Sequence, residues 1–237
     1  MEAELTDLGP GLAEWLECEV EEDTRTIWLF APIEERLVSR AIRALTWFAE
    51  CDEGAPIHVR ISSGGGSAWD GLALTQAIAG IPTPVYTYVQ GLAASAAAII
   101  WVAGDKRFAD PCCEILFHGF APQSDGHERG PSWQAEAQKL QYQANWTGDF
   151  LHKRAARGSP EYWRSVLLGA VPELRLLGAE AANMVFPCTP IAPYHRLRAH
   201  PGETSGDLEC PAPRGRVLHG PWPKPTPTPP SGDAPQG

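Results

Sequence analysis

The chain has 237 residues, of which 43% are hydrophobic, so it can bury one good-sized core and is expected to form one globular domain with tails. Its formal charge of −10 argues against nucleic acid as the main partner, because phosphate binding needs a basic face. The six cysteines form no regular disulfide framework, and the acidic start of the sequence lacks a basic signal region. Reduced thiols and a cytoplasmic location are therefore expected.

Composition divides the chain into three parts. Residues 1–23 contain no Lys or Arg and are expected to form an acidic N-terminal arm. Residues 24–187 carry regular hydrophobic patterns and are expected to form the folded domain. Residues 188–237 hold more than half of the prolines, including PWPKPTPTPP at 221–230, which is typical of polyproline II or a disordered tail. The cysteines and histidines near this tail fit no common zinc spacing, so no metal or other cofactor is expected.

The central part begins with alternating strand and helix patterns. Strands are predicted over 24–30, 56–62 and 83–89, and each is followed by a helix, over 33–50, 68–79 and 95–103 respectively. This alternation predicts an α/β fold in which helices pack on a parallel sheet.

Shorter elements complete the predicted domain. Short strands are expected at 105–109 and 113–120, and a polar, turn-rich loop follows at 121–131. One long helix is predicted over 132–157, and Ser159-Pro160 marks the start of another. A short strand and helix over 174–186 end the domain.

The segment VYTYVQGLAASAAAIIWVAG, residues 85–104, is long and apolar enough to suggest a membrane span. It also contains Gln90, two glycines and many alanines, which favour insertion poorly. Its first part is β-branched and aromatic, and its last part is made of helix formers. A strand, a tight glycine-containing turn and a helix explain this composition better than a span, so no membrane partner is expected.

Three features follow predicted strands and are candidates for chemistry. The SGGGS run follows the strand at 56–62, Ser95 follows the strand at 83–89, and His118 ends the strand at 113–117. Functional groups gather at the carboxyl ends of strands in a parallel sheet, so we expect the three to share one edge.

Each feature also has a structural interpretation. Ser95 is either a nucleophile at the positive end of a helix or simply the residue that caps that helix. The glycine run predicts an oxyanion hole or anion site, or else a flexible turn, and it lacks the GK[ST] of a phosphate loop. His118 is either a general base or a hydrogen-bonded structural residue.

Taken together, these features resemble the proteolytic subunit of the Clp protease family. The family pattern is S-P-G-G-S/V after one strand, G-x-A-A-S-x-G/A after the next, and I-H at the end of a third. The matching stretches here are ISSGGGSAWDGLA, GLAASAAA and ILFHGF. The resemblance spans about residues 24–187, and GLAASAAA is particularly similar to the Clp-related proteases of phage head maturation.

This resemblance implies a Clp/crotonase-like ββα spiral, with the helix at 132–157 as a protruding handle. It further implies a serine endopeptidase in which Ser95 is the nucleophile, His118 the base and Glu173 the acid that orients it. Backbone N–H groups of Gly66 and Ala96 would form the oxyanion hole. Most relatives carry Asp where Glu173 stands, so this acid departs from the family pattern.

Other departures lie around the same motifs. Gly64 stands where the family has proline, Ala96 where methionine is common, and His118 is followed by Gly-Phe rather than Gln-Pro. The change at Ala96 should be harmless, because the backbone N–H is what binds an oxyanion. The changes beside His118 affect the substrate cleft or a contact between subunits.

Family resemblance also implies partners. Members form stacked homo-oligomeric rings that enclose the active sites, cleave peptides or unfolded proteins, and often receive substrate from an AAA+ unfoldase. Two alternatives remain open at this point. One is a catalytically degenerate ring subunit or adaptor. The other is a crotonase-like acyl-CoA enzyme, which shares the fold but needs no Ser–His pair.

Overall fold

The computed structural model describes residues 19–120 and 133–191. The greater part of the predicted acidic arm, the turn-rich loop at 121–131 and nearly all of the predicted proline-rich tail lie outside the described residues. The structural findings below therefore concern the predicted catalytic domain and the few residues that flank it.

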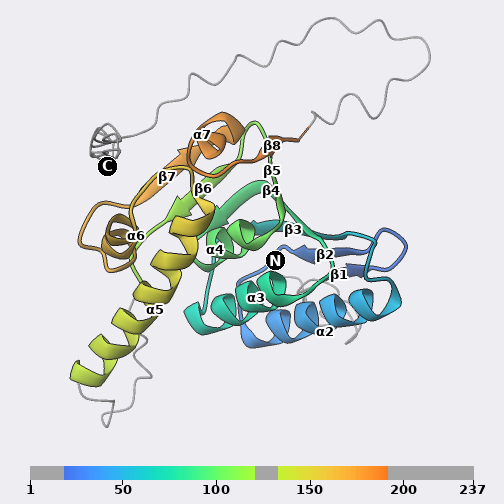
Figure 1. Cartoon of the computed structure of the whole chain (residues 1–237), viewed down its shortest axis with the longest axis horizontal. Coiled ribbons are helices and arrows are strands. Elements are labelled where there is room, and N and C mark those ends of the chain that lie inside the picture. The colour runs from blue at the N-terminus through green and yellow to red at the C-terminus, as the bar shows by residue number, and fades with distance from the viewer. Residues whose placement is uncertain (1–18, 121–132, 192–237) are drawn as a thin grey trace, which may run out of the picture.

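One sheet runs through the middle of the molecule (Figure 1). Its strands within the described ranges are β1 (Glu19–Glu21), β2 (Thr26–Leu29), β3 (Ile57–Ser63), β4 (Val85–Ala94), β5 (Lys106–Ala109), β6 (Glu114–Phe117), β7 (Leu174–Leu177) and β8 (Thr189–Pro190). The spatial order is β1-β2-β3-β4-β5-β8, and β6 pairs with both β4 and β7. Neighbours from β2 to β5 are parallel, as predicted, whereas β1 and β7 are antiparallel to their partners.

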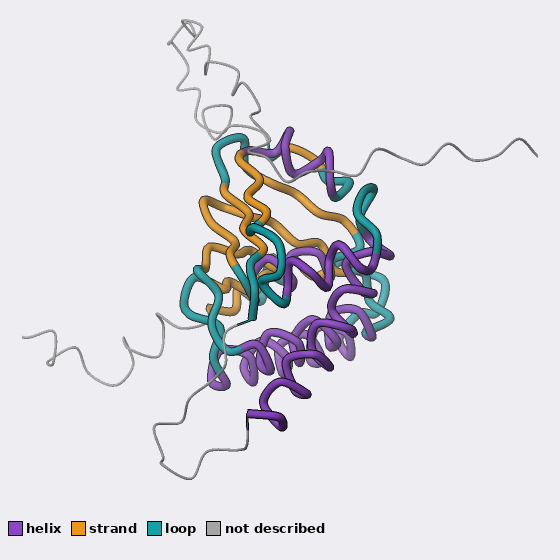
Figure 2. The backbone as a smooth tube through the Cα atoms, turned by 90° about the vertical axis from the view of Figure 1, so that its left-hand side faces the viewer, coloured by secondary structure: helices purple, strands orange, loops and turns teal. Residues whose placement is uncertain are grey.

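The predicted helices are also present. They are α2 (Glu35–Cys51), α3 (Ala68–Gly80), α4 (Ala96–Ala103), α5 (Trp133–Arg154), α6 (Pro160–Leu167) and α7 (Gly178–Val185). Helix α3 packs on both α2 and α4, and α4 packs on β3 and β4. Figure 2 shows the longer helices gathered on one side of the strands, while α5 extends away from the sheet in Figure 1. This arrangement is the predicted α/β fold with a protruding helix.

Alternation along β3 explains how the sheet is held to its helices. Ile57, Val59 and Ile61 are at most 1% exposed, and they face the core. Burying one such aliphatic side chain contributes about 1.5–3 kcal/mol. The intervening His58 and Arg60 are only partly buried, because successive strand side chains point to opposite faces. The side chains on the second face of β3 are therefore less completely covered than those that face the core.

Strand β4 corrects one prediction. The sequence suggested a tight turn after residue 89, but β4 continues through Gly91 to Ala94. Residues 86–89 pair with β5, whereas residues 92–94 pair with β6. Gly91, with φ of 82°, lies where the strand changes partner. The local pattern could not show this, because β6 supplies the hydrogen bonds from a distant part of the chain.

The apolar segment at 85–104 is thus a strand followed by a buried helix. None of the helices in the part of the chain that the structure describes is long and apolar enough to cross a membrane.

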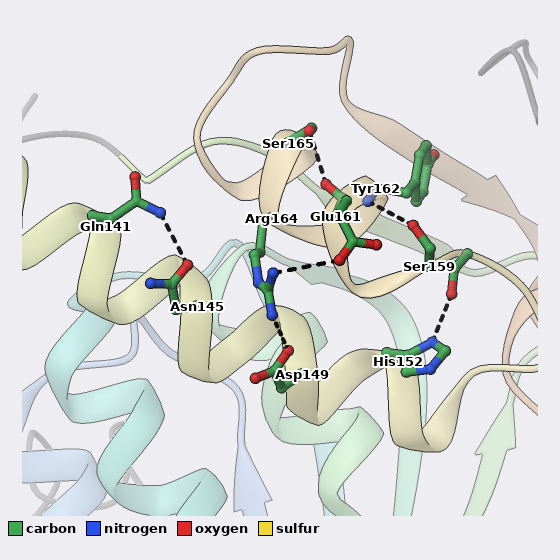
Figure 3. A network of polar contacts seen from close by, with 10 residues as sticks. Gln141, Asn145, Asp149, His152, Ser159, Glu161, Tyr162, Arg164 and Ser165 are labelled. Carbon is green, nitrogen blue, oxygen red and sulfur yellow. Dashed lines mark hydrogen bonds and ion pairs between the residues drawn. The ribbon is translucent and has the colours of Figure 1, made fainter.

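Helices α5 and α6 are joined by charged contacts (Figure 3). Arg164 of α6 pairs with Asp149 of α5 and with Glu161 one turn earlier in its own helix. The predicted start of α6 is confirmed, because the Ser159 hydroxyl accepts a hydrogen bond from the backbone N–H of Tyr162. The Arg164–Asp149 pair thus holds α6 against α5.

Candidate active site

Ser95 lies at the sharp turn between β4 and α4 and has an unusual backbone conformation. Its φ is 57° and its ψ is −124°, and Arg25 is the only other described non-glycine residue with a positive φ. Such strain in a non-glycine residue persists only where the surrounding structure imposes it, and it is concentrated at functional sites. A serine on a strained strand-to-helix turn is the arrangement that exposes the nucleophile in many serine hydrolases.

The Ser95 side chain is not used as a helix cap. The residue occupies the capping position of α4, as predicted, but its hydroxyl accepts no hydrogen bond from the first turn. Its backbone N–H is used instead to donate to the Leu116 carbonyl at 2.8 Å, which ties the turn to β6. The structural interpretation of Ser95 as a capping side chain is therefore wrong, and the hydroxyl remains available for other contacts.

Helix α4 is held firmly at its other end. All eight of its residues are buried, and two arginines donate to the carbonyls that its last turn leaves unpaired. Arg154 of α5 donates to Ala103 O at 2.9 Å, and Arg107 of β5 donates to Gly104 O at 2.8 Å. The position of Ser95 is thus determined by core packing and by both neighbouring elements.

The glycine run packs directly against this turn. Gly65 has φ of 93°, and a Cβ built there would lie 2.6 Å from Ala94 O and 2.7 Å from Ser95 Cβ. Ile33 fixes the next residue, since its N–H donates to Gly65 O and its carbonyl accepts from Ser67 N–H. Within the described residues, neither the Gly66 N–H nor the Ala96 N–H donates a hydrogen bond to a backbone carbonyl.

His118 follows β6 and lines the same cavity as Ser95 and Gly66. The cavity has a volume of about 170 Å³. The three residues expected at one edge of the sheet are thus brought together. His118 Nδ1 lies 2.7 Å from the Gly119 carbonyl oxygen. Because a carbonyl oxygen can only accept, Nδ1 is the donor in this contact.

The strand pairing of β6 with β7 places Glu173 opposite His118, but the Glu173 carboxylate is hydrogen-bonded to a different residue. Phe117 of β6 pairs with Leu174 of β7, so the residue before β7 lies at the level of the residue after β6. Glu173 Oε1 accepts a hydrogen bond from Arg175 Nη2 at 2.8 Å, and Arg175 also contacts Glu114. These two carboxylates raise the pKa of Arg175, with the Glu173 hydrogen bond as the larger cause. The role of Glu173 as the third member stays a prediction.

Several residues around the cavity were not expected from the sequence. Trp69, Phe120 and Leu140 give it apolar walls, and Glu136 and Lys139 form an ion pair with a separation of 3.4 Å on α5. Periodicity predicted α5 as a helix but could not tell which part of it would lie beside the serine. Gly65 belongs to the glycine run seen in the sequence, but its close approach to Ser95 could not be predicted because it depends on packing between distant parts of the chain.

A wider groove of about 730 Å³ lies between the carboxyl ends of α2 and α3. It contains none of the strained or catalytic-type residues described above. The smaller cavity is the better candidate because Ser95 and His118 both line it.

Comparison with known proteins agrees with this geometry. The Clp protease family model matches residues 19–155, which is more than half of the chain. The chain belongs to the Clp protease family. The resemblance seen in the sequence motifs is therefore confirmed, and so is the Clp/crotonase-like fold.

Curated relatives match the chain over a limited region. It is 37% identical over 98 residues to the ATP-dependent Clp protease proteolytic subunit 1 of Chlamydia muridarum, covering 40% of this chain and 51% of that protein. It is 39% identical over 98 residues to subunit 2 from Treponema denticola, covering 40% and 49% respectively. The chain thus spans about half the length of the curated relatives it matches.

Solved structures cover more of the chain at lower identity. A peptidase from Plasmodium falciparum superimposes with a TM-score of 0.61 at 18% identity, covering 72% of this chain and 97% of that one. A point mutant of the ClpP1 subunit from Listeria monocytogenes gives a TM-score of 0.60 at 19% identity, covering 74% and 96%. At these identities the likeness concerns the fold.

Proposed function

We propose that this chain is a serine-type endopeptidase that cleaves peptides or unfolded proteins with Ser95 as its nucleophile. The observation that carries the proposal is the strained, uncapped Ser95 at the start of α4, in one cavity with His118. Membership of the Clp protease family supports a serine peptidase activity.

In the proposed mechanism, His118 Nε2 removes the hydroxyl proton of Ser95 as Ser95 Oγ attacks the peptide carbonyl carbon. The carbonyl oxygen becomes an oxyanion, which the N–H groups of Gly66 and Ala96 bind. One such donor typically contributes about 3 kcal/mol to the transition state. The imidazolium then gives its proton to the leaving amine, and water hydrolyses the acyl-enzyme by the same steps in reverse order.

Glu173 is proposed as the acid that stabilises the imidazolium of His118. In the structure, His118 Nδ1 donates to the Gly119 carbonyl, and the Glu173 carboxylate accepts a hydrogen bond from Arg175. Glu173 would reach His118 after giving up Arg175, and catalytic contacts of this kind often tighten only with substrate bound. Glu173→Gln would preserve the size of the side chain and remove its charge, so a decrease in kcat would support this role.

The family also suggests the setting in which the site works. The names of the relatives describe proteolytic subunits of ATP-dependent proteases. We therefore propose a cytoplasmic homo-oligomeric ring that encloses the sites, with α5 as the handle that joins rings and an AAA+ unfoldase as partner. Size-exclusion chromatography with light scattering would test this, and a monomer at micromolar concentration would contradict the ring.

A non-catalytic ring subunit or adaptor is the second candidate. The observation that favours it is the existing pairing of Glu173 with Arg175, together with the contact of His118 with Gly119. Both candidates share the family and the fold, and they differ in whether Ser95 is reactive.

A fluorophosphonate probe separates the two candidates. Wild type should become labelled, Ser95→Ala should not, and His118→Ala should react much more slowly because no base remains. Ser62→Ala is a matched control, since Ser62 is a partly exposed serine on β3 that does not line the cavity. Equal labelling of wild type and Ser95→Ala, or no labelling of wild type, would refute the peptidase.

A further inference from the structure

One face of α5 forms a wall of the cavity that Ser95 lines. The α5 residues at this wall are Glu136, Lys139, Leu140 and Gln143. Counted from the first of them, they follow at intervals of three, four and seven residues, and residues at this spacing lie on one side of a helix. This side of α5 therefore brings a carboxylate, an ammonium group and a carboxamide to the candidate active site.

Glu136 is the more enclosed member of the ion pair on this face. Its side chain is 16% exposed, whereas that of Lys139 is 51% exposed, and the two charged groups are 3.4 Å apart. A largely enclosed carboxylate is costly unless a cation lies beside it. Lys139 has a long flexible stem and can turn into water at little cost, because ion pairs with an exposed partner are weak. Another cation can therefore take the place of Lys139 beside Glu136.

The other walls of the cavity also suit a cation. Trp69 and Phe120 line it, and Trp69, on the first turn of α3, is 46% exposed although tryptophan is usually well buried. The face of an aromatic ring attracts an ammonium or guanidinium group, and tryptophan does so best. Gln143 is only 3% exposed and adds a carboxamide, whose oxygen accepts hydrogen bonds. These groups together match the charge and the donors of a basic side chain.

The size of the cavity limits what it can receive. Its volume is about 170 Å³, whereas sites for drug-sized ligands occupy about 300–1,000 Å³, so the cavity suits a single long side chain. Ser95 and His118 line the same space, so this side chain belongs to a substrate residue beside the bond that Ser95 attacks. An acidic side chain is disfavoured, because it would meet the Glu136 carboxylate.

We propose that the cavity selects peptides with lysine or arginine beside the cleaved bond, and that Glu136 is the residue that determines this preference. The cation of the substrate replaces Lys139 at the Glu136 carboxylate and lies against the Trp69 ring. The carboxylate thus stays paired throughout the exchange. This substrate preference rests on the proposed peptidase function and adds a substrate class to it.

Cleavage of matched peptides by the full-length chain tests the preference. The peptides share one sequence and differ only at a central residue, which is lysine, arginine, norleucine or glutamate. Norleucine keeps the carbon stem of lysine and lacks its ammonium group. Mass spectrometry identifies the cleaved bond, and initial rates give kcat/KM. In wild type, kcat/KM for the lysine peptide should exceed that for the norleucine peptide by about 10- to 150-fold, the range expected for a hydrogen bond to a charged group.

Two variants on α5 separate recognition from a structural role. Glu136→Gln keeps the size of the side chain and removes its charge, so the ratio of kcat/KM between the lysine and norleucine peptides should fall by about 10-fold or more. Lys139→Met removes the competing ammonium group and should raise kcat/KM for the lysine peptide by up to about 5-fold. An ion pair with only a structural role would change stability in both variants and leave the ratio unchanged.

Glu180→Gln is the matched control. It makes the same change of carboxylate to carboxamide at an exposed residue in the first turn of α7. Since Glu180 does not line the cavity, this variant should keep the ratio of wild type.

Fluorophosphonate labelling of Ser95 distinguishes failure of the preference from failure of the proposed function. Labelled wild type that cleaves the lysine and norleucine peptides equally overturns the preference alone, and so does a lysine preference that survives in Glu136→Gln. Faster cleavage of the glutamate peptide would assign recognition to Lys139 and would also overturn it. Wild type that is neither labelled nor able to cleave any of the peptides refutes the peptidase, and the preference with it.

Discussion

Gly65→Ala should destabilise the turn that carries Ser95. Gly65 has φ of 93°, which an alanine adopts only with strain. The new Cβ would also lie 2.6 Å from Ala94 O and 2.7 Å from Ser95 Cβ, where real Cβ atoms are essentially never found. Neither neighbour is the end of a flexible side chain, so the backbone of the turn itself must move.

Two contributions set the size of the effect. An unfavourable backbone conformation costs about 1–3 kcal/mol, and overpacking of a well-packed site costs about 1–3 kcal/mol. The free energy of unfolding should therefore decrease by roughly 2–6 kcal/mol. Because the displaced atoms include Ser95 itself, the rate of labelling by a fluorophosphonate should also decrease, even under conditions where the variant remains folded.

Urea denaturation measures the first effect, and labelling kinetics at low denaturant measure the second. Gly64→Ala is the matched control, because a Cβ at Gly64 meets nothing within 4 Å. Its unfolding free energy should stay within about 0.5 kcal/mol of wild type, as for other substitutions away from special features. Equal stability of the Gly65 and Gly64 variants would refute the close packing of the glycine run on Ser95.

Three further predictions concern other parts of the fold. Burial, followed by the charges of two nearby arginines, lowers the pKa of His58 below 6.5. The imidazole of His58 therefore becomes protonated at a higher pH in the unfolded chain than in the folded protein. The free energy of unfolding should decrease as the pH falls from about 6.5 through the folded pKa of His58. Urea titrations at pH 7 and pH 5 should show a smaller decrease for His58→Gln than for wild type. Trp101 is fully buried, so Trp101→Ala should lower the free energy of unfolding by about 3–5 kcal/mol, measured by thermal or chemical denaturation. Trp47 is 44% exposed, so Trp47→Ala should lower it by less than about 1 kcal/mol. Cys113 is buried, and burial raises the pKa of its thiol to about 12. Iodoacetamide at pH 8 should therefore alkylate the exposed Cys51 before Cys113, as followed by peptide mapping. Equal rates of alkylation at the two cysteines would contradict the burial of Cys113.

Local sequence patterns were enough to predict most of the elements. The stretch PIHVRIS at 56–62 was predicted as the strand that forms β3, and the apolar spacing of residues 33–50 predicted α2. They also placed Ser95 and His118 after strands, which was sufficient to expect both at one edge of a parallel sheet. The two short strands β1 and β8 were not predicted, because strands of three and two residues have no periodicity to detect.

Sequence by itself thus determined the α/β class, the order of the elements and the pair of residues at the centre of the site, since these follow from short-range periodicity and from motifs. Tertiary structure alone decided the strained conformation of Ser95, the packing of Gly65 against it and the pairing of Glu173 with Arg175. It also decided on which side of the sheet the longer described helices lie. The physical reason is that strand register and helix packing join residues that are distant in sequence, so the local pattern around any one of them does not reveal its neighbours.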